Sequence, residues 1–546
     1  MVNWIGATAS PHELLYPMIS STRNRDILQS TGIVMGAILV SRMLGFVREW
    51  TVAHQIGSSA VTDAYYAAFT LPDFLNYLVA GGALGLIFIP VFTKYQVENR
   101  EDEGWHVFST VMTLMTLALI VLVGLGEIFT AQLVRFIAPG FNLAQKAEVV
   151  FLTRLMLPAQ LFLYLGCVMG AVQNAKARFL VPALAAVVYN IGIISGGWLL
   201  SSRLGITGFA IGLLFGTFCG FFLLQLVAVW RLGAKFKPNF DYRHPGFRMF
   251  VKLAIPIMLA LSIDFTDNWM IRWFGSYLAP ASITWLTYAR TLMAVPLSTV
   301  AYALGIASFP FLAQLHSEGK FDELNHTLNA TLKGLVLILV PISALTIVLT
   351  QPIIYFVFSH TRLRATDFLA TAAALGIFAI GIFARGAQTL VSRGFNATKD
   401  TMTPAVVGTA FTFLTLPLYW YCARRWDYLG LAAASSLAII FYAIVLFALL
   451  ARRTRNRRVG ELLSCLTKVS LASTFVAILC SRLTVWLEMR VAWHTPLGSL
   501  KVLVIVTAIG LPFILLLARL MGVVEIENYC KKLIPVRVGR VVEAPE

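Results

Sequence analysis

The sequence predicts an all-α, polytopic membrane protein of about 14 transmembrane helices, built as two parallel six-helix lobes plus a C-terminal helix pair. Of the 546 residues, 58% are hydrophobic and only 13% are charged, whereas ordinary soluble domains have about 25% charged residues. The apolar residues form runs of about 20, the length that a helix needs to cross a bilayer. A repeated pattern of short motifs predicts the two lobes.

Spanning helices are predicted wherever an apolar run is long enough. The first lobe has them at 28–56, 62–95, 105–133, 147–175, 180–202 and 206–231. The second lobe has them at 249–274, 280–314, 325–350, 367–392, 402–423 and 429–451, and the last pair is at 462–487 and 497–521. The resulting segments are an N-terminal tail (1–27), an N-lobe (28–231), a basic linker (232–248), a C-lobe (249–451), a basic loop (452–461), helices 13 and 14 (462–521) and a C-terminal tail (522–546).

Positive charge is concentrated in the connections between apolar runs. The formal charge is +17, and the linker 232–248, the loop 452–461 and both tails carry much of it. Since cytoplasmic connections of membrane proteins are enriched in Lys and Arg, we expect both termini in the cytoplasm and no nucleic-acid partner. Residues 1–26 are polar and lack a cleavable signal, so the first helix is expected to remain as an anchor. The six cysteines are dispersed, which predicts no disulfide framework and no metal site.

Short motifs recur at nearly one spacing. Ala83-Leu84-Gly85 with Pro90 is repeated as Ala303-Leu304-Gly305 with Pro310, an offset of 220 in the numbering (303 − 83). Asn174-Ala175 is repeated as Asn396-Ala397, an offset of 222 (396 − 174). Because six spans return the chain to the side where it began, the two copies are expected to be parallel, as in one class of transporter. Substrate sites of such proteins lie between the halves near the midplane.

Charged residues occur at membrane depth in the first two helices. They are Arg42, Arg48, Glu49, Asp63 and Asp73. Ionised side chains are costly in lipid, so we expect them to line a polar interior. The guanidinium groups of Arg42 and Arg48 match phosphate oxygens in pairs. Alternatively, Arg48 and Glu49 mark the helix end, Arg42 pairs with a carboxylate, and Asp63 caps the start of its own helix.

The second half has its own candidates. Asp264, Asp267 and Asn268 are spaced to share a face of the seventh helix. Arg290 in the eighth helix is the expected contribution to a cationic site, and Arg385 in the tenth either joins it or pairs with a neighbouring helix. No catalytic motif is found, so no enzyme activity and no cofactor are expected. A nucleotide domain is also missing, which leaves ion gradients, the membrane potential or substrate concentration to drive movement.

At these residues the sequence resembles the MurJ (MviN) family of lipid II flippases, within the multidrug/oligosaccharidyl-lipid/polysaccharide exporter superfamily. The segments that carry the resemblance are SRMLGFVRE, TDAYYAAFTLPDFL, APGF, QNAKARFLVPALAAVVYNI, TYARTLMAVP, ALGIASFP and FNATKDTMTP. The resemblance implies a bacterial inner-membrane protein with a central cationic cavity and a groove for the lipid tail on the last two helices. It also implies that Arg42, Arg48, Asp63 and Asp73 are tied to function.

The sequence departs from the family pattern near the expected head-group site. Asn76 stands where the family has a further arginine, and Gly81-Gly82 where it has Glu-Gly. The family's Asp-Arg pair is here Arg290-Thr291, which turns the arginine about 100° around the helix. The head group therefore stays open between lipid II and another polyprenyl-linked glycan.

Three functions remain as hypotheses. The first is a flippase that moves a polyprenyl-pyrophosphate-linked peptidoglycan precursor to the outer leaflet by alternating access, coupled to the membrane potential or a monovalent ion. The second is a cation-coupled exporter of small molecules on the same fold. The third is a scaffold that recruits envelope enzymes. For the flippase we expect a monomer, surrounded by membrane lipids and associated with cell-wall synthesis enzymes.

Overall fold

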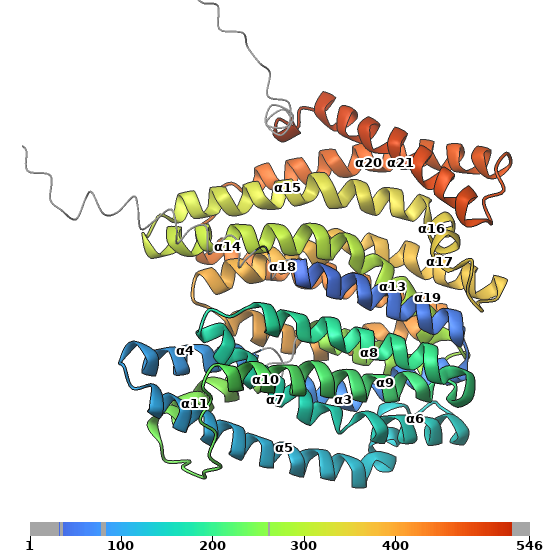
Figure 1. Cartoon of the computed structure of the whole chain (residues 1–546). Coiled ribbons are helices and arrows are strands. Elements are labelled where there is room, and N and C mark those ends of the chain that lie inside the picture. Colours follow the sequence, from blue (N-terminus) through green and yellow to red (C-terminus); the bar gives the residue numbers. More distant parts are fainter. Residues whose placement is uncertain (1–31, 33–35, 78–82, 260–262, 527–546) are drawn as a thin grey trace, which may run out of the picture. The chain divides into compact units, whose positions relative to one another are not determined.

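Every regular element that the structure describes is a helix. The computed structural model describes residues 32, 36–77, 83–259 and 263–526, and of residues 83–86, 255–259 and 263–264 it describes the backbone only. Figure 1 shows the labelled helices in chain order. No strand occurs in these ranges, in agreement with the predicted all-α class.

The helices follow the predicted spans closely. The first helix, residues 36–55, is followed by α2 (Ala60–Ala68), α3 (Thr70–Leu75), α4 (Ala83–Val97), α5 (Glu101–Ile137), α6 (Leu143–Met156), α7 (Ala159–Ala175), α8 (Leu180–Leu204), α9 (Thr207–Thr217), the π-helix η2 (Phe218–Leu223) and α10 (Leu224–Arg231). After the linker come α11 (Pro245–Leu259), α12 (Ile263–Gly275), α13 (Ser282–Pro296), the π-helix η3 (Leu297–Ala301), α14 (Tyr302–Ser317), α15 (Phe321–Val348), α16 (Thr350–Phe358), α17 (Ala365–Ile380), α18 (Ile382–Ala397), α19 (Met402–Arg453), α20 (Val459–Glu488) and α21 (Pro496–Leu520).

Nine of the described helical segments are long and apolar enough to cross a membrane, or ten if the bent pair α17 and α18 forms one span. One of the nine, α19, contains two predicted spans, because the backbone leaves helical geometry at Trp426 and Asp427. The predicted boundary between 402–423 and 429–451 lies at this break. The total of 14 stays a prediction, since residues 78–82 and 260–262 lie outside the described ranges.

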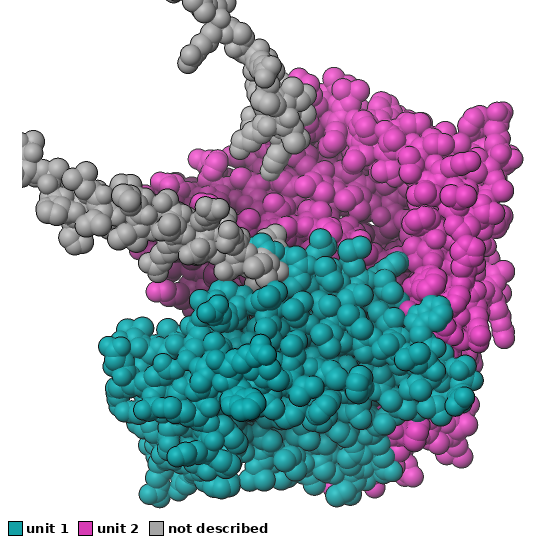
Figure 2. All heavy atoms as spheres, in the orientation of Figure 1, with its two compact units in different colours: residues 1–48, 71–128, 154–258 teal, residues 49–70, 129–153, 259–546 magenta. Residues whose placement is uncertain are grey.

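The chain divides into two compact units, coloured separately in Figure 2. One contains residues 1–48, 71–128 and 154–258, and the other contains 49–70, 129–153 and 259–546. Two segments of the predicted N-lobe therefore cluster with the second unit. The bonds within that unit give the reason: Trp273 Nε1 donates to the Phe136 carbonyl (2.9 Å), and the Arg362 N–H donates to the Ala53 carbonyl (3.2 Å).

The internal repeat is visible in the backbone. Left-handed φ angles occur at Gly205 (56°) and Asp427 (56°), whose numbers differ by 222 (427 − 205). The same spacing relates Ala177 (56°) to Lys399 (58°) and Gly233 (81°) to Arg455 (52°), while Asn99 pairs with Gly319 at an offset of 220 and Gly57 with Ala281 at 224. Left-handed φ is rare outside glycine, so five matched turns show that both halves fold with the same sequence of bends.

Glycines bring α8 and α9 into close contact in the first unit. A Cβ on Gly192 would lie 2.3 Å from Gly216 Cα, and one on Gly196 would lie 2.5 Å from Gly212 Cα. Small residues let two membrane helices approach until their backbones are in contact. Because lipid provides no hydrophobic driving force for helix association, van der Waals packing between the backbones stabilises the pair instead. This pair is a rigid part of the first unit.

The C-terminal pair packs on the second half. Helix α20 lies against α15, and α21 lies against α16 and α20. Leu345, Val476, Cys480, Val506 and Ile514 form the centre of a buried apolar cluster among these helices. The predicted accessory pair is therefore tied to the second unit by its own core.

Candidate functional site

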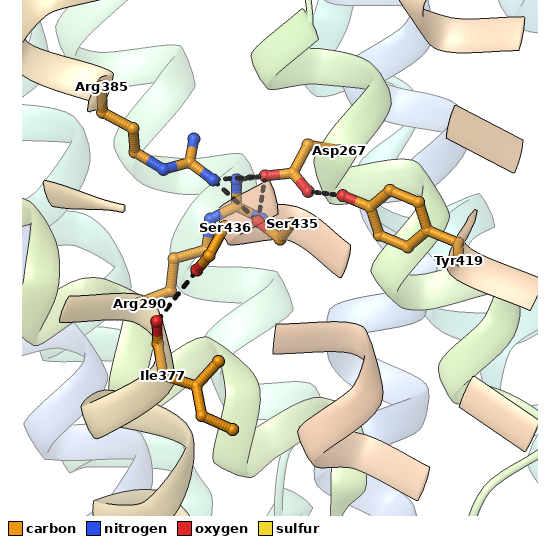
Figure 3. A network of polar contacts seen from close by, with 7 residues as sticks. All are labelled: Asp267, Arg290, Ile377, Arg385, Tyr419, Ser435 and Ser436. Carbon is orange, nitrogen blue, oxygen red and sulfur yellow. Dashed lines mark hydrogen bonds and ion pairs between the residues drawn. The ribbon is translucent and has the colours of Figure 1, made fainter. Parts of the chain in front are cut away.

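A buried aspartate in the second unit joins four helices. Asp267 on α12 accepts hydrogen bonds at Oδ2 from Arg385 Nη2 on α18 (2.7 Å) and Ser435 Oγ on α19 (2.9 Å). Arg290 on α13 donates through Nη2 to the same oxygen, and the Tyr419 hydroxyl on α19 donates to Oδ1. Figure 3 shows these side chains converging on one carboxylate.

Ser435 belongs to a polar pair in an otherwise apolar stretch of α19. Its Oγ also accepts a bond from Arg385 Nη2 (2.8 Å), so carboxylate, guanidinium and hydroxyl form a closed triangle. The neighbouring Ser436 donates to the Ile377 carbonyl on α17 (3.0 Å), which is also drawn in Figure 3. The two serines thus hold α19 against α17 and α18 at the level of the aspartate.

Two guanidinium groups share one carboxylate in this group. Counted over Asp267, Arg290 and Arg385 alone, the formal charge is +1. Asp267 and Arg385 are 6% and 8% exposed, while the side chain of Arg290 is 16% exposed. Buried ions are tolerated only when paired and hydrogen-bonded, and removing one partner typically costs about 3–5 kcal/mol. Arg290 is the more accessible of the two cations.

The space beside the aspartate is very small. A cavity of about 10 Å³ is lined by Asp267, Arg385, Tyr419 and Ser435, among others. This is at the lower limit of what holds one water molecule. The group is therefore a packed ionic contact between helices rather than an open binding pocket.

Asp63 stabilises a distant helix. From α2 it accepts the backbone N–H groups of Ala281 (2.7 Å) and Thr284 (2.8 Å) and the Thr284 hydroxyl (2.6 Å). These donors form the N-terminus of α13, whose own N-cap, Ala281, offers no side-chain bond. The expectation that Asp63 caps its own helix is wrong, because Ser59 occupies that position and accepts the Thr62 N–H.

The remaining candidates of the first two helices lie in different surroundings. Glu49 is 5% exposed and accepts a bond from the Tyr66 hydroxyl (2.5 Å), both within the second unit. Arg42 is exposed and Arg48 half-buried, and both belong to the first unit. Asp73 in α3 and Asn76 just after it, also in the first unit, are half-buried and lie in the interior of the predicted second span. Arg42, Arg48, Glu49, Asp73 and also Asn268 are not isolated: each takes part in a further hydrogen bond, ion pair, ring contact or electrostatic interaction.

Two candidate positions fall outside what the structure describes. They are the side chain of Asp264 and the pair Gly81-Gly82. Asn268 follows Asp267 in α12 but is exposed, so it does not share the buried environment of its neighbour. Among the described residues no cluster of His, Cys, Asp or Glu could hold a metal ion, and Cys167, Cys219, Cys422, Cys465 and Cys480 are free thiols.

The sequence reasoning missed Tyr419 and Ser435. Tyr419 is 1% exposed, and its hydroxyl is the kind of polar tip that needs a partner when buried. The serine pair within an apolar run was the available signal, since hydroxyls at membrane depth commonly bond across helices. Their partner, however, follows only from the fold.

Comparisons with known proteins agree on one family. The model of the family described as lipid II flippase MurJ matches residues 52–507. The probable lipid II flippase MurJ of Vibrio cholerae serotype O1 is 25% identical over 441 residues, covering 79% of this chain and 84% of the relative. The corresponding protein of Thermotoga maritima is 25% identical over 492 residues, covering 90% and 96%.

Solved structures show the same fold. Lipid II flippase MurJ in an inward closed conformation superposes with a TM-score of 0.71 at 24% identity, covering 87% of this chain and 98% of that one. An inward-facing multidrug resistance transporter of the MATE family, from the MOP superfamily, gives a TM-score of 0.61 at 13% identity, covering 76% and 94%. The predicted all-α membrane fold and the family resemblance are confirmed.

Proposed function

This chain belongs to the lipid II flippase MurJ family, and from that premise we propose that it carries the undecaprenyl-pyrophosphate-linked peptidoglycan precursor, lipid II, from the cytoplasmic to the outer leaflet of the bacterial inner membrane. The observation that carries the proposal is the match of the family model to residues 52–507. The chain acts as a transporter without catalysis, and it needs no cofactor.

Arginines receive the pyrophosphate in this proposal. Arg290 is the contribution of the second half, supported by its sharing of Asp267 with Arg385 and by the partial exposure of its side chain. When an anion arrives, Arg290 turns part of its guanidinium fork to the phosphate oxygens, and Arg385 continues to neutralise Asp267 (2.7 Å). Arg42 and Arg48 supply the first half's positive charge.

Movement follows alternating access of the two six-helix lobes. Asp73 and Asn76 act as polar and conformational residues of the first lobe, and Asp264, Asp267 and Arg385 as those of the second. Glu49 and Asp63 play the same part in the N-terminal segment that clusters with the second unit. The cytoplasm-negative potential favours export of an anion by about 2.3 kcal/mol per charge per 100 mV. That is enough to bias the cycle without ATP, with or without a coupled monovalent ion.

Topology and partners complete the proposal. Both termini, the linker 232–248 and the loop 452–461 face the cytoplasm, in keeping with their Lys and Arg content. Helices α20 and α21 hold the lipid tail beside the second lobe. The protein works as a monomer associated with cell-wall synthesis enzymes.

A cation exporter is less well supported. Carriers of cationic drugs need a carboxylate that the drug can neutralise, but Asp267 already accepts two guanidinium groups and two hydroxyls. The likeness to MATE transporters concerns the fold alone.

Complementation tests the proposal. In a strain depleted of its own flippase, the wild-type chain and Arg203→Gln, a change at an exposed position, should restore growth. Arg48→Ala and Arg290→Ala should not, although the proteins reach the membrane. Purified protein in vesicles should move lipid II, with a second polyprenyl-linked glycan as comparison. Growth of both arginine variants at the wild-type rate would contradict the assignment.

A further inference from the structure

A basic pocket lies where three membrane-crossing helices meet at their ends. Helix α15 begins at Phe321, α19 ends at Arg453, and α20 begins at Val459. Between them is a pocket of about 810 Å³. The residues that decide its chemistry are Asp322, Asn325, Arg453, Arg455, Arg457 and Arg458. Because it lies at the ends of spans, the pocket faces the head-group layer of the membrane.

Positive charge dominates this pocket. Four arginines line it against the single carboxylate of Asp322, a formal charge of +3 (4 − 1). Arg453 donates to Asp400 in the turn after α18, which fixes that side chain. No carboxylate pairs with Arg455, Arg457 or Arg458 in the part of the chain that the structure describes. Arg455 and Arg457 therefore present guanidinium groups with no paired carboxylate among the described residues, and Arg458 adds a third guanidinium, which lies near Glu461 at the start of α20.

Buried asparagines of α15 hold the short link between α19 and α20 in place. Asn325 Nδ2 donates to the Thr454 carbonyl (2.8 Å), and Asn329 and Asn456 exchange amide bonds of 3.2 and 3.0 Å. Asn325, Asn329 and Thr454 are each 3% exposed. A link anchored by buried amides has already lost its freedom, so binding an anion orders only the arginine side chains.

The internal repeat supplies a built-in comparison. Arg455 has φ 52°, and its counterpart in the first half, at the offset of 222 (455 − 233), is Gly233 with φ 81°. Glycine adopts this conformation without cost, whereas a side chain there is strained by about 1–2 kcal/mol. The second half therefore has a strained arginine at the position where the first half has an unstrained glycine.

The basic link of the first half is instead tied along α5. Its turn is followed by Lys235, whose Nζ pairs with Asp102 (2.5 Å). The chain then continues along α5, where Ser109 accepts the Lys237 N–H (3.2 Å) and Thr110 bonds Asn239 (2.6 Å). In the second half, α20 begins almost at once and leaves the pocket open.

We propose that this pocket binds the phosphate group of an anionic lipid head group from the leaflet that it faces. Guanidinium forks match phosphate oxygens in pairs, and basic pockets between membrane helices are suited to such head groups. Arg455, Arg457 and Arg458 contact the phosphate, and Arg453, held by Asp400, shapes the wall. This site is separate from the transported substrate and does not depend on which glycan is moved.

Lipid titration with native mass spectrometry tests the site. The full chain in neutral detergent is titrated with dioctanoyl-phosphatidylglycerol, dioctanoyl-phosphatidylcholine and sn-glycerol 3-phosphate. The test variant is Arg455→Gln/Arg457→Gln/Arg458→Gln. Its matched control is Arg231→Gln/Arg243→Gln/Arg248→Gln, which removes the same charge from exposed positions of the other basic link. A further variant, Arg455→Gly, removes one guanidinium while suiting the backbone.

We expect the wild type and the control to prefer phosphatidylglycerol over phosphatidylcholine by at least tenfold. The triple test variant should lose that preference, and Arg455→Gly should weaken binding several-fold without a lower melting temperature. Equal losses in the test and control triples would overturn the site. Binding of sn-glycerol 3-phosphate as tight as that of the lipid would overturn the lipid as its occupant.

Discussion

Replacing Asp63 tests directly how a residue of the first half of the sequence stabilises a helix of the second half. It lies on α2, is 1% exposed, and accepts three hydrogen bonds from residues 281 and 284 at the start of α13. No side chain of α13 itself offers a cap at that end. Asp63→Ala would leave these buried donors without an acceptor.

The cost follows from the donors. An orphaned buried N–H costs about 1–3 kcal/mol, and a carboxylate at a helix N-terminus contributes up to about 1 kcal/mol more through the helix dipole. Two backbone donors and the dipole together give about 2–7 kcal/mol for Asp63→Ala. Asp63→Asn keeps one acceptor oxygen and should cost about 2–3 kcal/mol. Thr284→Val removes only a hydroxyl donor and should cost about 1 kcal/mol.

Hydrogen exchange measures this loss where it occurs. Since about 1.4 kcal/mol is a factor of ten, the lower bound of about 2 kcal/mol means that the peptide covering residues 279–286 should exchange at least about 25-fold faster in Asp63→Ala. Peptides of the α8 and α9 pair should not change. If exchange at residues 279–286 in Asp63→Ala stays within threefold of the wild type, the trans-capping argument fails.

Three further outcomes are expected. Asp267→Asn should lower the free energy of unfolding by about 3–5 kcal/mol, because two buried guanidinium groups lose their counterion. Arg385→Met should cost less, since Arg290 still neutralises Asp267. Thermal unfolding in detergent ranks the two variants, and a larger loss of stability for Arg385→Met would contradict this reasoning. Gly212→Leu should prevent stable folding, because its Cβ would lie 2.5 Å from a backbone carbonyl, whereas Gly124→Leu, with nothing within 4 Å, should be tolerated; equal yields of folded protein would count against close α8–α9 packing. The hydrogen bond from His106 lowers the pKa of Asp241 from its ordinary 3.8. The stabilising contribution of the Asp241 carboxylate is therefore complete above about pH 4 and is lost as the pH falls through the lowered pKa. Hydrogen exchange of residues 235–242 should rise over that pH range in the wild type, and an identical rise in Asp241→Asn would refute the role of this carboxylate.

The apolar runs predicted most of the fold. Span length and turn composition located nearly every helix, including the break at Trp426 and Asp427, because a polar gap separates the two runs there. The short helix α16 and the division between α6 and α7 were not predicted, since both lie inside continuous apolar stretches. Hydropathy reports where a chain can cross a membrane, but it carries little information about bends within a crossing.

The candidate site was predicted less completely. The cost of charge in lipid singled out Asp267, Arg290 and Arg385 as residues that need polar surroundings, and the structure pairs them with one another. Their pairing could not be read from the sequence, because Asp267 and Arg385 are 118 residues apart. The same holds for Asp63, whose partner lies 221 residues away. Composition identifies which groups need a partner, and only the fold supplies it.

The matched left-handed turns have a practical use for anyone preparing this protein. Ala177 and Lys399 carry side chains at φ 56° and 58°, conformations that glycine adopts freely. Replacing each residue with glycine should raise the free energy of unfolding by about 1 kcal/mol, after subtracting the greater conformational entropy that glycine gives the unfolded chain. Both positions lie in turns between helices, so we expect the glycine variants to keep the fold and to ease purification.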